Sequence, residues 1–450
     1  MFYRTFVRFL TLVAHTFYER IEVVGVENVP ARGAVILAGN HPNALIDGLL
    51  LMCHAGRTPV HFLGNAKLWR IPLLARLLDA LGAVPVLRRE EHGPDADNRN
   101  AFERVDEVLA RGGCVAIFPE GISHTDSQLS TLKTGTARMA LRAAERRKTG
   151  VAIVPFGLTY LDRHRFRSQV LLHFGAPMSI DEQGPAAYGD DEAETVRELT
   201  AELRGRLSRV TLNAPDRATL RFIHAARRLY KPVAAKLTPA TWVELSRRLV
   251  DRYTRIAGEP DIQRLRAGIE AYQSRLELLG LKDHQLSNPV DVHMATTRIV
   301  WRMALVVLLL PLVLPGAIVA VPVAWLAASV SSRFSDDVDD IATLKVATAV
   351  PALLAICALL TVAAGIAFGW LWAVLALVLL PVSFFAALFM LQKQAQLLVS
   401  IRSVLRLAWL RGDIEALVDE RRKLVIAVRT TVDRYSDPDI RRIFDASDFG

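Results

Sequence analysis

Short apolar runs and amphipathic stretches alternate along the first part of the chain. Four runs have the length and composition of buried strands: residues 34–38, 83–87, 115–118 and 151–157. Residues 101–111 and 136–148 carry apolar positions at helical spacing, and a glycine soon follows each stretch. Strands that alternate with helices predict an α/β domain with a mixed, mainly parallel sheet flanked by helices. We expect this domain to occupy residues 21–215.

After this domain the pattern becomes helical. Residues 216–297 are mostly amphipathic and rich in arginine, which predicts a helical region. Residues 303–330 contain almost no charge and would extend about 42 Å as a helix, whereas about 20 apolar residues are enough to cross a bilayer core. Residues 347–391 are equally apolar. We therefore predict transmembrane helices within residues 298–392 and a helical tail over residues 393–450.

The number of spans depends on where the apolar residues turn. Residues 347–391 are long enough for two helices, with Gly365 and Gly369 near a turn between them. Residues 303–330 are expected to form either one kinked span or a re-entrant hairpin, because three prolines interrupt them: Pro311, Pro315 and Pro322.

Charges on both sides of the apolar region predict its orientation. Basic residues precede and follow it: Arg298, Arg302, Lys393, Arg402 and Arg406. The loop inside the region is acidic, with Asp336, Asp337, Asp339 and Asp340. Because cytoplasmic flanks carry the excess of lysine and arginine, both flanks are expected on the cytoplasmic side, with two or four crossings. We thus expect a multi-pass membrane protein whose first domain faces the cytoplasm.

The composition of the chain limits the classes of partner that we expect it to bind. The chain is 52% hydrophobic and 22% charged, with a net charge of +9. Nucleic acid is not an expected partner, because the sequence has no zinc-ligand spacing, recognition motif or basic low-complexity tail. A lipid bilayer and phosphorylated substrates fit both the charge and the apolar segments. Residues 1–20, where arginines interrupt an aromatic run, are expected to form an interfacial helix, with a signal peptide or a core helix as alternatives.

Candidate chemistry begins directly after the first buried strand, where His41 and Asp47 follow Asn40. Histidine accepts a proton near neutral pH, and a neighbouring carboxylate fixes its tautomer and stabilises the imidazolium. Such a pair is suited to removing a proton from an alcohol so that its oxygen can attack a carbonyl. The alternative is a turn in which these polar residues only cap the next helix.

Further polar residues follow other strands. Arg88 lies six positions after Gly82, and Glu120, Gly121 and Ser123 follow the strand at residues 115–118. Ligands of parallel-sheet folds bind at the carboxyl ends of strands, so these residues and His41 are expected to meet along one edge. Lys133 lies a little further along, two positions before a glycine. The other histidines considered, His54, His61 and His124, have no evident partner pattern and are expected to be structural.

The chain thus carries four blocks in order: the histidine–aspartate motif at residues 41–47, the glycine-to-arginine strand at residues 82–88, the Pro-Glu-Gly block at residues 119–121 and the proline-bearing strand at residues 151–157. In this order, the four blocks resemble the glycerolphosphate and lysophosphatidate acyltransferase superfamily. The resemblance implies that His41 is the general base and Asp47 its orienting acid. It also implies that Arg88, Glu120, Gly121, Ser123 and Lys133 contact the substrate, with Arg88 and Lys133 binding phosphate. For Arg88, Arg89 is the alternative after a one-residue shift, and for Glu120 the alternative is organisation of the turn. The donor would be an acyl thioester on coenzyme A or an acyl carrier protein, and the acceptor would be of the glycerol-phosphate type.

One spacing departs from the superfamily's usual pattern, because five residues rather than four separate His41 from Asp47. Pro42 makes a continuous helix from His41 unfavourable, so a loop is expected to absorb the extra residue. This spacing, together with residues 226–232 and 279–285, resembles the fungal-type glycerol-3-phosphate and dihydroxyacetone-phosphate acyltransferase branch.

The mechanism implied by these residues is direct acyl transfer. It requires no metal and no cofactor beyond the thioester, and the three cysteines have no metal-ligand or disulfide spacing. We therefore expect a membrane-bound O-acyltransferase of phospholipid biosynthesis that acts on glycerol 3-phosphate or 1-acylglycerol 3-phosphate. The alternatives are acylation of another lysophospholipid or lipid, hydrolysis of thioesters, or a catalytically silent lipid-binding membrane protein.

Overall fold

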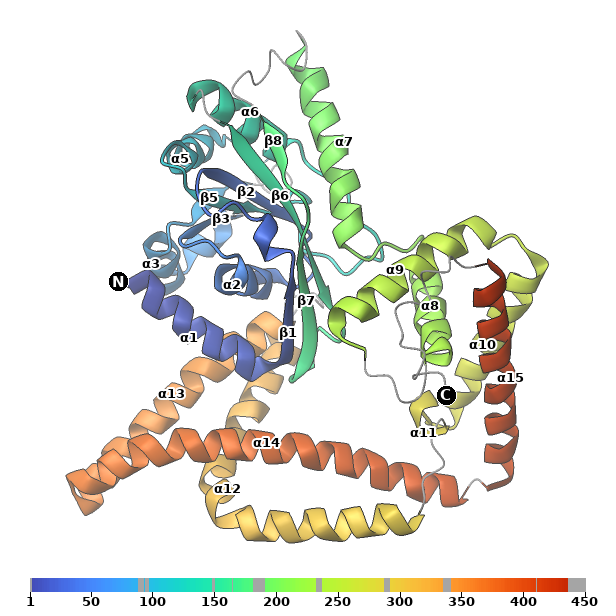
Figure 1. The fold of residues 1–450 in the computed structure, drawn as a ribbon. Coiled ribbons are helices and arrows are strands. Elements are labelled where there is room, and N and C mark those ends of the chain that lie inside the picture. The colour runs from blue at the N-terminus through green and yellow to red at the C-terminus, as the bar shows by residue number, and fades with distance from the viewer. Residues whose placement is uncertain are drawn as a thin grey trace. The chain divides into compact units, whose positions relative to one another are not determined.

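The computed structural model describes residues 2–87, 93, 97–147, 150–163, 165–180, 191–231, 237–286, 292–334, 341–409 and 411–435. The chain divides into two compact units (Figure 1). The first comprises residues 1–217 together with residues 238–243 and 337–343. The second comprises residues 218–237, 244–336 and 344–450.

The first unit contains a sheet that has eight strands within the described residues. The strands are β1 (Tyr18–Val24), β2 (Ala34–Gly39), β3 (Val60–Asn65), β4 (Val84–Val86), β5 (Cys114–Ile117), β6 (Val151–Tyr160), β7 (Ser168–Phe174) and β8 (Met178–Ile180). Its helices are α1 (Phe2–Phe17), α2 (Ala44–His54), α3 (Pro72–Ala80), α5 (Arg99–Ala110), α6 (Gly135–Arg147) and α7 (Glu192–Val210), with short 3₁₀ turns at Val26–Asn28 and Ala66–Arg70.

The strand order is β1-β7-β6-β2-β5-β3-β4, with β8 paired to β6. Most pairings are parallel: β1 with β7, β2 with β5 and β6, and β3 with β4 and β5. Only β6 with β7 and β6 with β8 pair antiparallel among the described strands. The predicted mixed, mainly parallel sheet flanked by helices is therefore confirmed.

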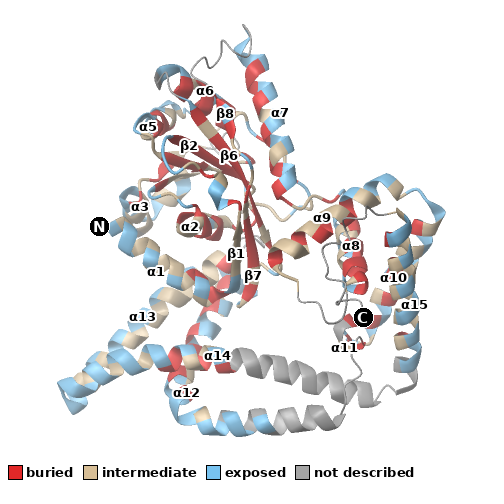
Figure 2. Ribbon diagram, in the orientation of Figure 1, coloured by how far each residue is buried: buried red, intermediate tan, exposed pale blue. Residues whose placement is uncertain are grey.

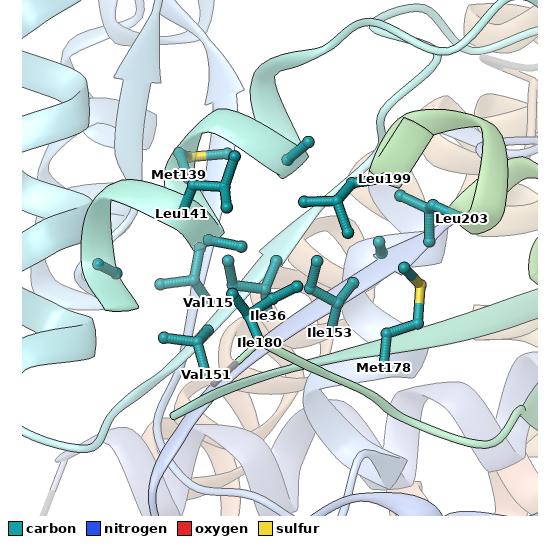
Figure 3. Close-up of a cluster of buried hydrophobic side chains, with 14 of the residues drawn as sticks. Ile36, Val115, Met139, Leu141, Val151, Ile153, Met178, Ile180, Leu199 and Leu203 are labelled. Atoms are coloured by element: carbon teal, nitrogen blue, oxygen red, sulfur yellow. The ribbon is translucent and has the colours of Figure 1, made fainter. Parts of the chain in front are cut away.

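Strand β2 lies in the middle of the sheet, and all six of its residues are buried. Ala34, Ile36 and Ala38 belong to a large core cluster that continues into α5, α6 and α7, and Figure 3 shows Leu199 and Leu203 of α7 lying over Ile153 of this cluster. Alternation along a strand directs Val35 and Leu37 to the opposite face. Burial of both faces explains why β2 is an uninterrupted apolar run (Figure 2).

The described part of the second unit is helical, as predicted. Outside its most apolar helices it contains α8 (Arg217–Tyr230), α9 (Pro239–Ile256), α10 (Pro260–Leu278), α11 (Asp283–Leu286) and α15 (Arg411–Tyr435), of which α8 and α9 also contribute residues to the first unit. The buried Asp283 carboxylate accepts hydrogen bonds from the Tyr272 hydroxyl at 3.0 Å and from Arg421 Nε at 3.0 Å. This ion pair joins α11 to α15. Burial lowers the pKa of Arg228, and the nearby Asp283 partly offsets that effect.

Three helices are long and apolar enough to cross a membrane within the described residues: Val307–Phe334 of α12 (Val292–Phe334), α13 (Ile341–Phe368) and Trp370–Met390 of α14 (Trp370–Trp409). The predicted turn near Gly369 is confirmed, since this residue has φ +95° and separates α13 from α14. The expected even number of crossings stays a prediction. The acidic loop at Asp336, Asp337, Asp339 and Asp340 lies outside the described residues.

Helix α12 is one continuous element, which supports the kinked span over the re-entrant hairpin. Its backbone meets α14 at Gly316, where a Cβ atom would lie 2.0 Å from Ser383 O. The Ser383 hydroxyl accepts a hydrogen bond from Gly316 N at 2.6 Å and donates one to Leu312 O at 2.5 Å. A side chain of α14 thus inserts into the hydrogen-bond ladder of α12, which is a recognised cause of helix bending.

Candidate active site

The end of β2 is fixed to the neighbouring strand β6. The Asn40 side chain accepts a hydrogen bond from Leu158 N at 2.7 Å and donates one to Leu158 O at 3.0 Å, so it imitates one more backbone pairing. Gly39 packs so closely on the Phe156 ring that a Cβ atom would lie 2.3 Å from it. These two contacts determine where the chain leaves the sheet. They therefore determine the position of His41, which follows directly.

His41 and Asp47 form the predicted pair. Nδ1 of His41 lies 2.8 Å from Oδ2 of Asp47. The Asp47 side chain is fully buried, whereas 16% of the His41 side chain is exposed. Since the carboxylate occupies Nδ1, the other ring nitrogen, Nε2, is the one left to accept a proton from a substrate. The arrangement is that of a general base oriented by a buried acid.

The extra residue between His41 and Asp47 is accommodated by a loop, as expected. Helix α2 begins at Ala44, and Ala44 itself has φ +41°, which is uncommon for a residue other than glycine. Asn43 N donates a hydrogen bond of 2.7 Å to Asp47 Oδ2. The loop is therefore held by the same carboxylate that holds the imidazole.

Tyr160, the last residue of β6, also contacts Asp47, which no pattern in the sequence predicted. Its hydroxyl donates to Asp47 Oδ1 at 2.5 Å. Burial, followed by the charge of Asp47, raises the pKa of Tyr160 well above its ordinary value, so the hydroxyl keeps its proton. The Tyr18 ring lies 5.8 Å from the Tyr160 ring, and the Tyr18 hydroxyl accepts from Asn43 Nδ2 at 3.3 Å. Asp47 thus receives hydrogen bonds at both oxygens.

One face of the imidazole rests on an aromatic ring. Phe118 stacks on His41 with ring centroids 3.9 Å apart and planes 7° apart. Phe118 in turn meets Phe156 edge-on, with centroids 6.0 Å apart. Because Phe118 directly precedes the Pro119-Glu120-Gly121 turn, this stacking brings the Pro-Glu-Gly block to the histidine–aspartate motif.

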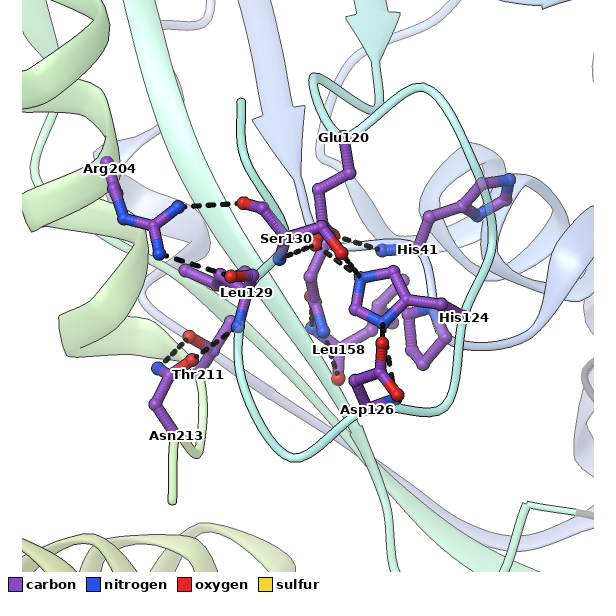
Figure 4. Close-up of polar contacts among 12 residues, drawn as sticks. His41, Glu120, His124, Asp126, Leu129, Ser130, Leu158, Arg204, Thr211 and Asn213 are labelled. Carbon is purple, nitrogen blue, oxygen red and sulfur yellow. Dashed lines mark hydrogen bonds and ion pairs between the residues drawn. The ribbon is translucent and has the colours of Figure 1, made fainter. Parts of the chain in front are cut away.

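The Glu120 carboxylate is buried and surrounded by protein donors (Figure 4). His41 N donates to its Oε1 at 3.3 Å, and Ser130 N donates to its Oε2 at 2.6 Å. His124 Nε2 lies 2.5 Å from the same Oε2. His124 Nδ1 accepts from Asp126 N at 3.2 Å, which leaves the ring proton on Nε2, directed at Glu120. These contacts favour the turn-organising alternative for Glu120.

His124 links the two loops of the site, although the sequence predicted only a structural role for it. Besides its bond to Glu120, its backbone N donates to His41 O at 3.1 Å. The loop of the Pro-Glu-Gly block is therefore bonded to the backbone of His41 both through the Glu120 carboxylate and directly. The only sequence signal was its position four residues after Glu120.

Glu120→Gln is expected to destabilise the protein by about 1–3 kcal/mol, because an amide nitrogen would then face donors inside a buried pocket of polar groups. The midpoint and slope of denaturant unfolding measure this change. Asp126→Asn is the matched control, since its side chain is 63% exposed and its backbone N–H remains. Equal stability of the two variants would contradict the assigned role of Glu120.

Gly121 and Lys133 meet in the same turn. Gly121 has φ +76°, and a Cβ atom there would lie 2.8 Å from Lys133 Nζ. Lys133 N donates to Pro119 O at 2.7 Å, which holds the lysine beside the turn. The positive φ and the nearby lysine side chain each favour glycine at this position. Ser123 is half-buried in the following loop, and its role stays a prediction.

Arg88 and its alternative Arg89 lie outside the described residues. A different arginine approaches the catalytic loop from the turn between β6 and β7. Arg163 Nη1 donates to Pro42 O at 3.2 Å. The sequence did not single out this cation, because 121 residues separate it from Pro42.

No group of three or more metal-ligating side chains is found in the described part of the chain. The site brings together a partly exposed imidazole, a buried acid behind it and a cation at the neighbouring turn. A mainly parallel sheet presents this set at one edge, and three helices among the described residues are long and apolar enough to fit membrane association.

Comparisons with known proteins identify the class further. Residues 20–159 match the Acyltransferase family, and residues 222–440 match the Glycerol-3-phosphate acyltransferase 2 C-terminal domain family. The chain therefore contains an Acyltransferase domain followed by a Glycerol-3-phosphate acyltransferase 2 C-terminal domain. The predicted resemblance is confirmed at the level of these two domains.

Two yeast relatives of this chain are named as glycerol-3-phosphate O-acyltransferases. Glycerol-3-phosphate O-acyltransferase 2 of Saccharomyces cerevisiae is 38% identical over 237 residues, which cover 50% of this chain and 31% of the yeast protein. Glycerol-3-phosphate O-acyltransferase 1 of the same yeast is 34% identical, covering 54% of this chain and 33% of that protein. The matched segments thus span about a third of these relatives. A solved structure, the 1-acyl-sn-glycerophosphate (LPA) acyltransferase of Thermotoga maritima, is 20% identical with a TM-score of 0.34 and covers 45% of this chain and 77% of that one.

Proposed function

We propose that this protein is a membrane-bound O-acyltransferase that moves a fatty acyl group from a thioester to a glycerol-phosphate-type acceptor in phospholipid biosynthesis. The observation that carries the proposal is the pairing of His41 Nδ1 with the buried Asp47 at 2.8 Å, beside the Glu120 turn. Relatives named glycerol-3-phosphate O-acyltransferases and a 1-acyl-sn-glycerol-3-phosphate acyltransferase of Borreliella burgdorferi, 30% identical over 161 residues, support the acceptor class.

The proposed reaction is a single displacement at the thioester carbonyl. His41 Nε2 takes the proton from the acceptor hydroxyl as the oxygen attacks the carbonyl carbon. The C–O bond forms, the C–S bond breaks, and the departing thiolate receives the proton back from the imidazolium. Asp47 holds the ring in the required tautomer and stabilises its transient positive charge. No covalent enzyme intermediate is required.

Substrate phosphate is proposed to bind cations at the same edge. Lys133 supplies a point charge beside Gly121, and Arg88 is assigned to the same task by the resemblance of its block. The donor thioester on coenzyme A or an acyl carrier protein, the bilayer as the protein's location, and the cytoplasmic position of the catalytic domain are parts of the proposal. The apolar α12, α13 and α14 support membrane insertion.

Purified protein in lipid or detergent tests the proposal directly. We expect acyl transfer from labelled acyl-CoA or acyl carrier protein to one of three acceptors: glycerol 3-phosphate, dihydroxyacetone phosphate or 1-acylglycerol 3-phosphate. Release of free fatty acid without an acylated product would instead support a thioester hydrolase. Absence of both reactions, with folded protein and every donor and acceptor pair, would overturn the proposal.

Lys133→Met is expected to raise the KM of the acceptor by on the order of tenfold while leaving the KM of the thioester nearly unchanged, because one charge-assisted phosphate contact is lost. Steady-state kinetics with each substrate varied in turn measures the difference. Arg138→Met removes an exposed cation of α6 and serves as the matched control. A larger rise in the KM of the thioester would assign Lys133 to the donor.

A further inference from the structure

Tyr160 contacts the buried acid from the end of the late proline-bearing strand, three residues beyond Gly157. It ends β6, 113 residues after Asp47, and its hydroxyl reaches Asp47 Oδ1 at 2.5 Å. The side of the carboxylate that it occupies is the one away from the imidazole, because His41 and Asn43 N both contact Oδ2. The two oxygens thus have different partners.

A fully buried carboxylate is unfavourable unless hydrogen bonds replace its lost hydration. Asn43 N and His41 serve Oδ2, whereas the Tyr160 hydroxyl serves Oδ1. Hydrogen bonds at both oxygens restrict rotation of the carboxylate about its bond to Cβ. The direction in which Oδ2 faces the imidazole therefore depends on a donor at Oδ1.

Tyr160 remains a donor over the working pH range. Burial is the main cause that raises the pKa of its hydroxyl, and the charges of Asp47 and Tyr18 add to it. The positive end of the O–H dipole consequently stays against Asp47. It offsets part of the negative charge that the carboxylate presents to the imidazole on its other side.

We infer that Tyr160 is a positioning residue of the acyl-transfer site, which holds the Asp47 carboxylate in the plane that receives His41 and moderates its charge. The inference rests on the proposed function for its catalytic consequence, but its structural content concerns the hydrogen bond between His41 and Asp47 itself. Tyr160 acts through Asp47 and is not assigned any contact with substrate.

The titratable and charged groups facing this network come from several elements. They are Tyr18 of β1, Asp47 of α2, Tyr160 of β6, His41 and Glu120 of the two catalytic loops, His124 beyond the Pro-Glu-Gly turn, and Arg163 of the turn after β6. Removal of the Tyr160 hydroxyl leaves all these other groups in place. A change in the pH profile of Tyr160→Phe is therefore traceable to that hydroxyl.

The test compares Tyr160→Phe with Tyr18→Phe. Tyr18 is a buried neighbour whose hydroxyl contacts Asn43, one step further from the Asp47 carboxylate than the Tyr160 hydroxyl, so Tyr18→Phe is the comparison variant. For Tyr160→Phe we expect kcat to fall by about 10–100-fold, with the KM of the acceptor changed less than about twofold. The acid limb of the kcat/KM profile should move to higher pH, because the unmoderated carboxylate holds the imidazolium proton more strongly. The loss should consequently shrink as the pH rises.

A second measurement separates this inference from the proposed function. Proton NMR detects the hydrogen shared between His41 Nδ1 and Asp47, with His41→Ala to assign its signal. Tyr160→Phe should shift or broaden that signal, whereas Tyr18→Phe should leave it close to its original position. If the wild-type protein transferred no acyl group, the proposed function would fail while the signal still tested the geometry. An unchanged signal and acid limb in Tyr160→Phe, or equal changes in Tyr18→Phe, would overturn the inference.

Discussion

Replacing His41 by alanine should lower kcat for acyl transfer by roughly 10²–10⁴-fold or more, the range expected when a positioned general base is removed. The acceptor hydroxyl is a poor nucleophile until it loses its proton, and Nε2 of His41 is the atom left to take it, since Nδ1 faces Asp47 at 2.8 Å. The acceptor KM should change little, because the imidazole is not proposed to bind phosphate. Steady-state kinetics over a range of pH measures both effects.

Two controls make the His41 result interpretable. The variant should unfold at nearly the same denaturant concentration as the wild type, because the removed side chain is stacked on Phe118 at the edge of the core and is partly exposed. Added free imidazole should restore part of the lost rate, since it can occupy the vacated space and accept the proton. Near-normal turnover in His41→Ala, with the fold retained, would remove His41 from the role of base.

The parts of the fold that could be predicted from sequence are those determined locally. Strand β2 appears as an apolar run because both faces of a central parallel strand are covered, and its observed bounds, Ala34–Gly39, exceed the predicted run by one residue. The pairing of His41 with Asp47 was predictable because Pro42 excludes a continuous helix and leaves the loop free to adjust. The turn between α13 and α14 was predictable because Gly369 permits a positive φ.

Contacts between distant segments were not predictable in this way. Tyr160 looks like any aromatic residue at the end of a strand, and only the pairing of β6 beside β2 brings it to Asp47. His124 gave no partner pattern, because its partners are a carboxylate in the same loop and the backbone of a loop about eighty residues earlier. The hydrogen bonds that Ser383 makes within the ladder of α12 come from another helix. Such contacts depend on the order of the strands in the sheet and on the packing of helices. The periodicity of a single segment does not predict them.

The second variant with a large expected effect on kcat changes Asp47, the carboxylate that contacts His41. Asp47→Asn should lower kcat on the order of 10³–10⁴-fold, as expected when an amide replaces the acid that fixes the tautomer of a catalytic histidine. In Asp47 both oxygens accept, from Asn43 N and His41 at Oδ2 and from Tyr160 at Oδ1. An amide has one oxygen, so its NH₂ group must face one of these donors. Either the imidazole turns or the Tyr160 hydroxyl loses its acceptor.

A double-variant cycle distinguishes this cooperative pair from two independent contributions. If Asp47 acts through His41, the His41→Ala/Asp47→Asn protein should be scarcely slower than His41→Ala alone, because an orienting acid has no effect without its base. Imidazole should then restore less activity in the double variant than in His41→Ala, since the carboxylate that orients the ring is gone. If the loss of rate in the double variant equalled the product of the two single losses, Asp47 would contribute separately, through the stability of the loop that begins α2. The ratio of rates therefore decides whether these side chains form one catalytic unit, which their 2.8 Å contact predicts.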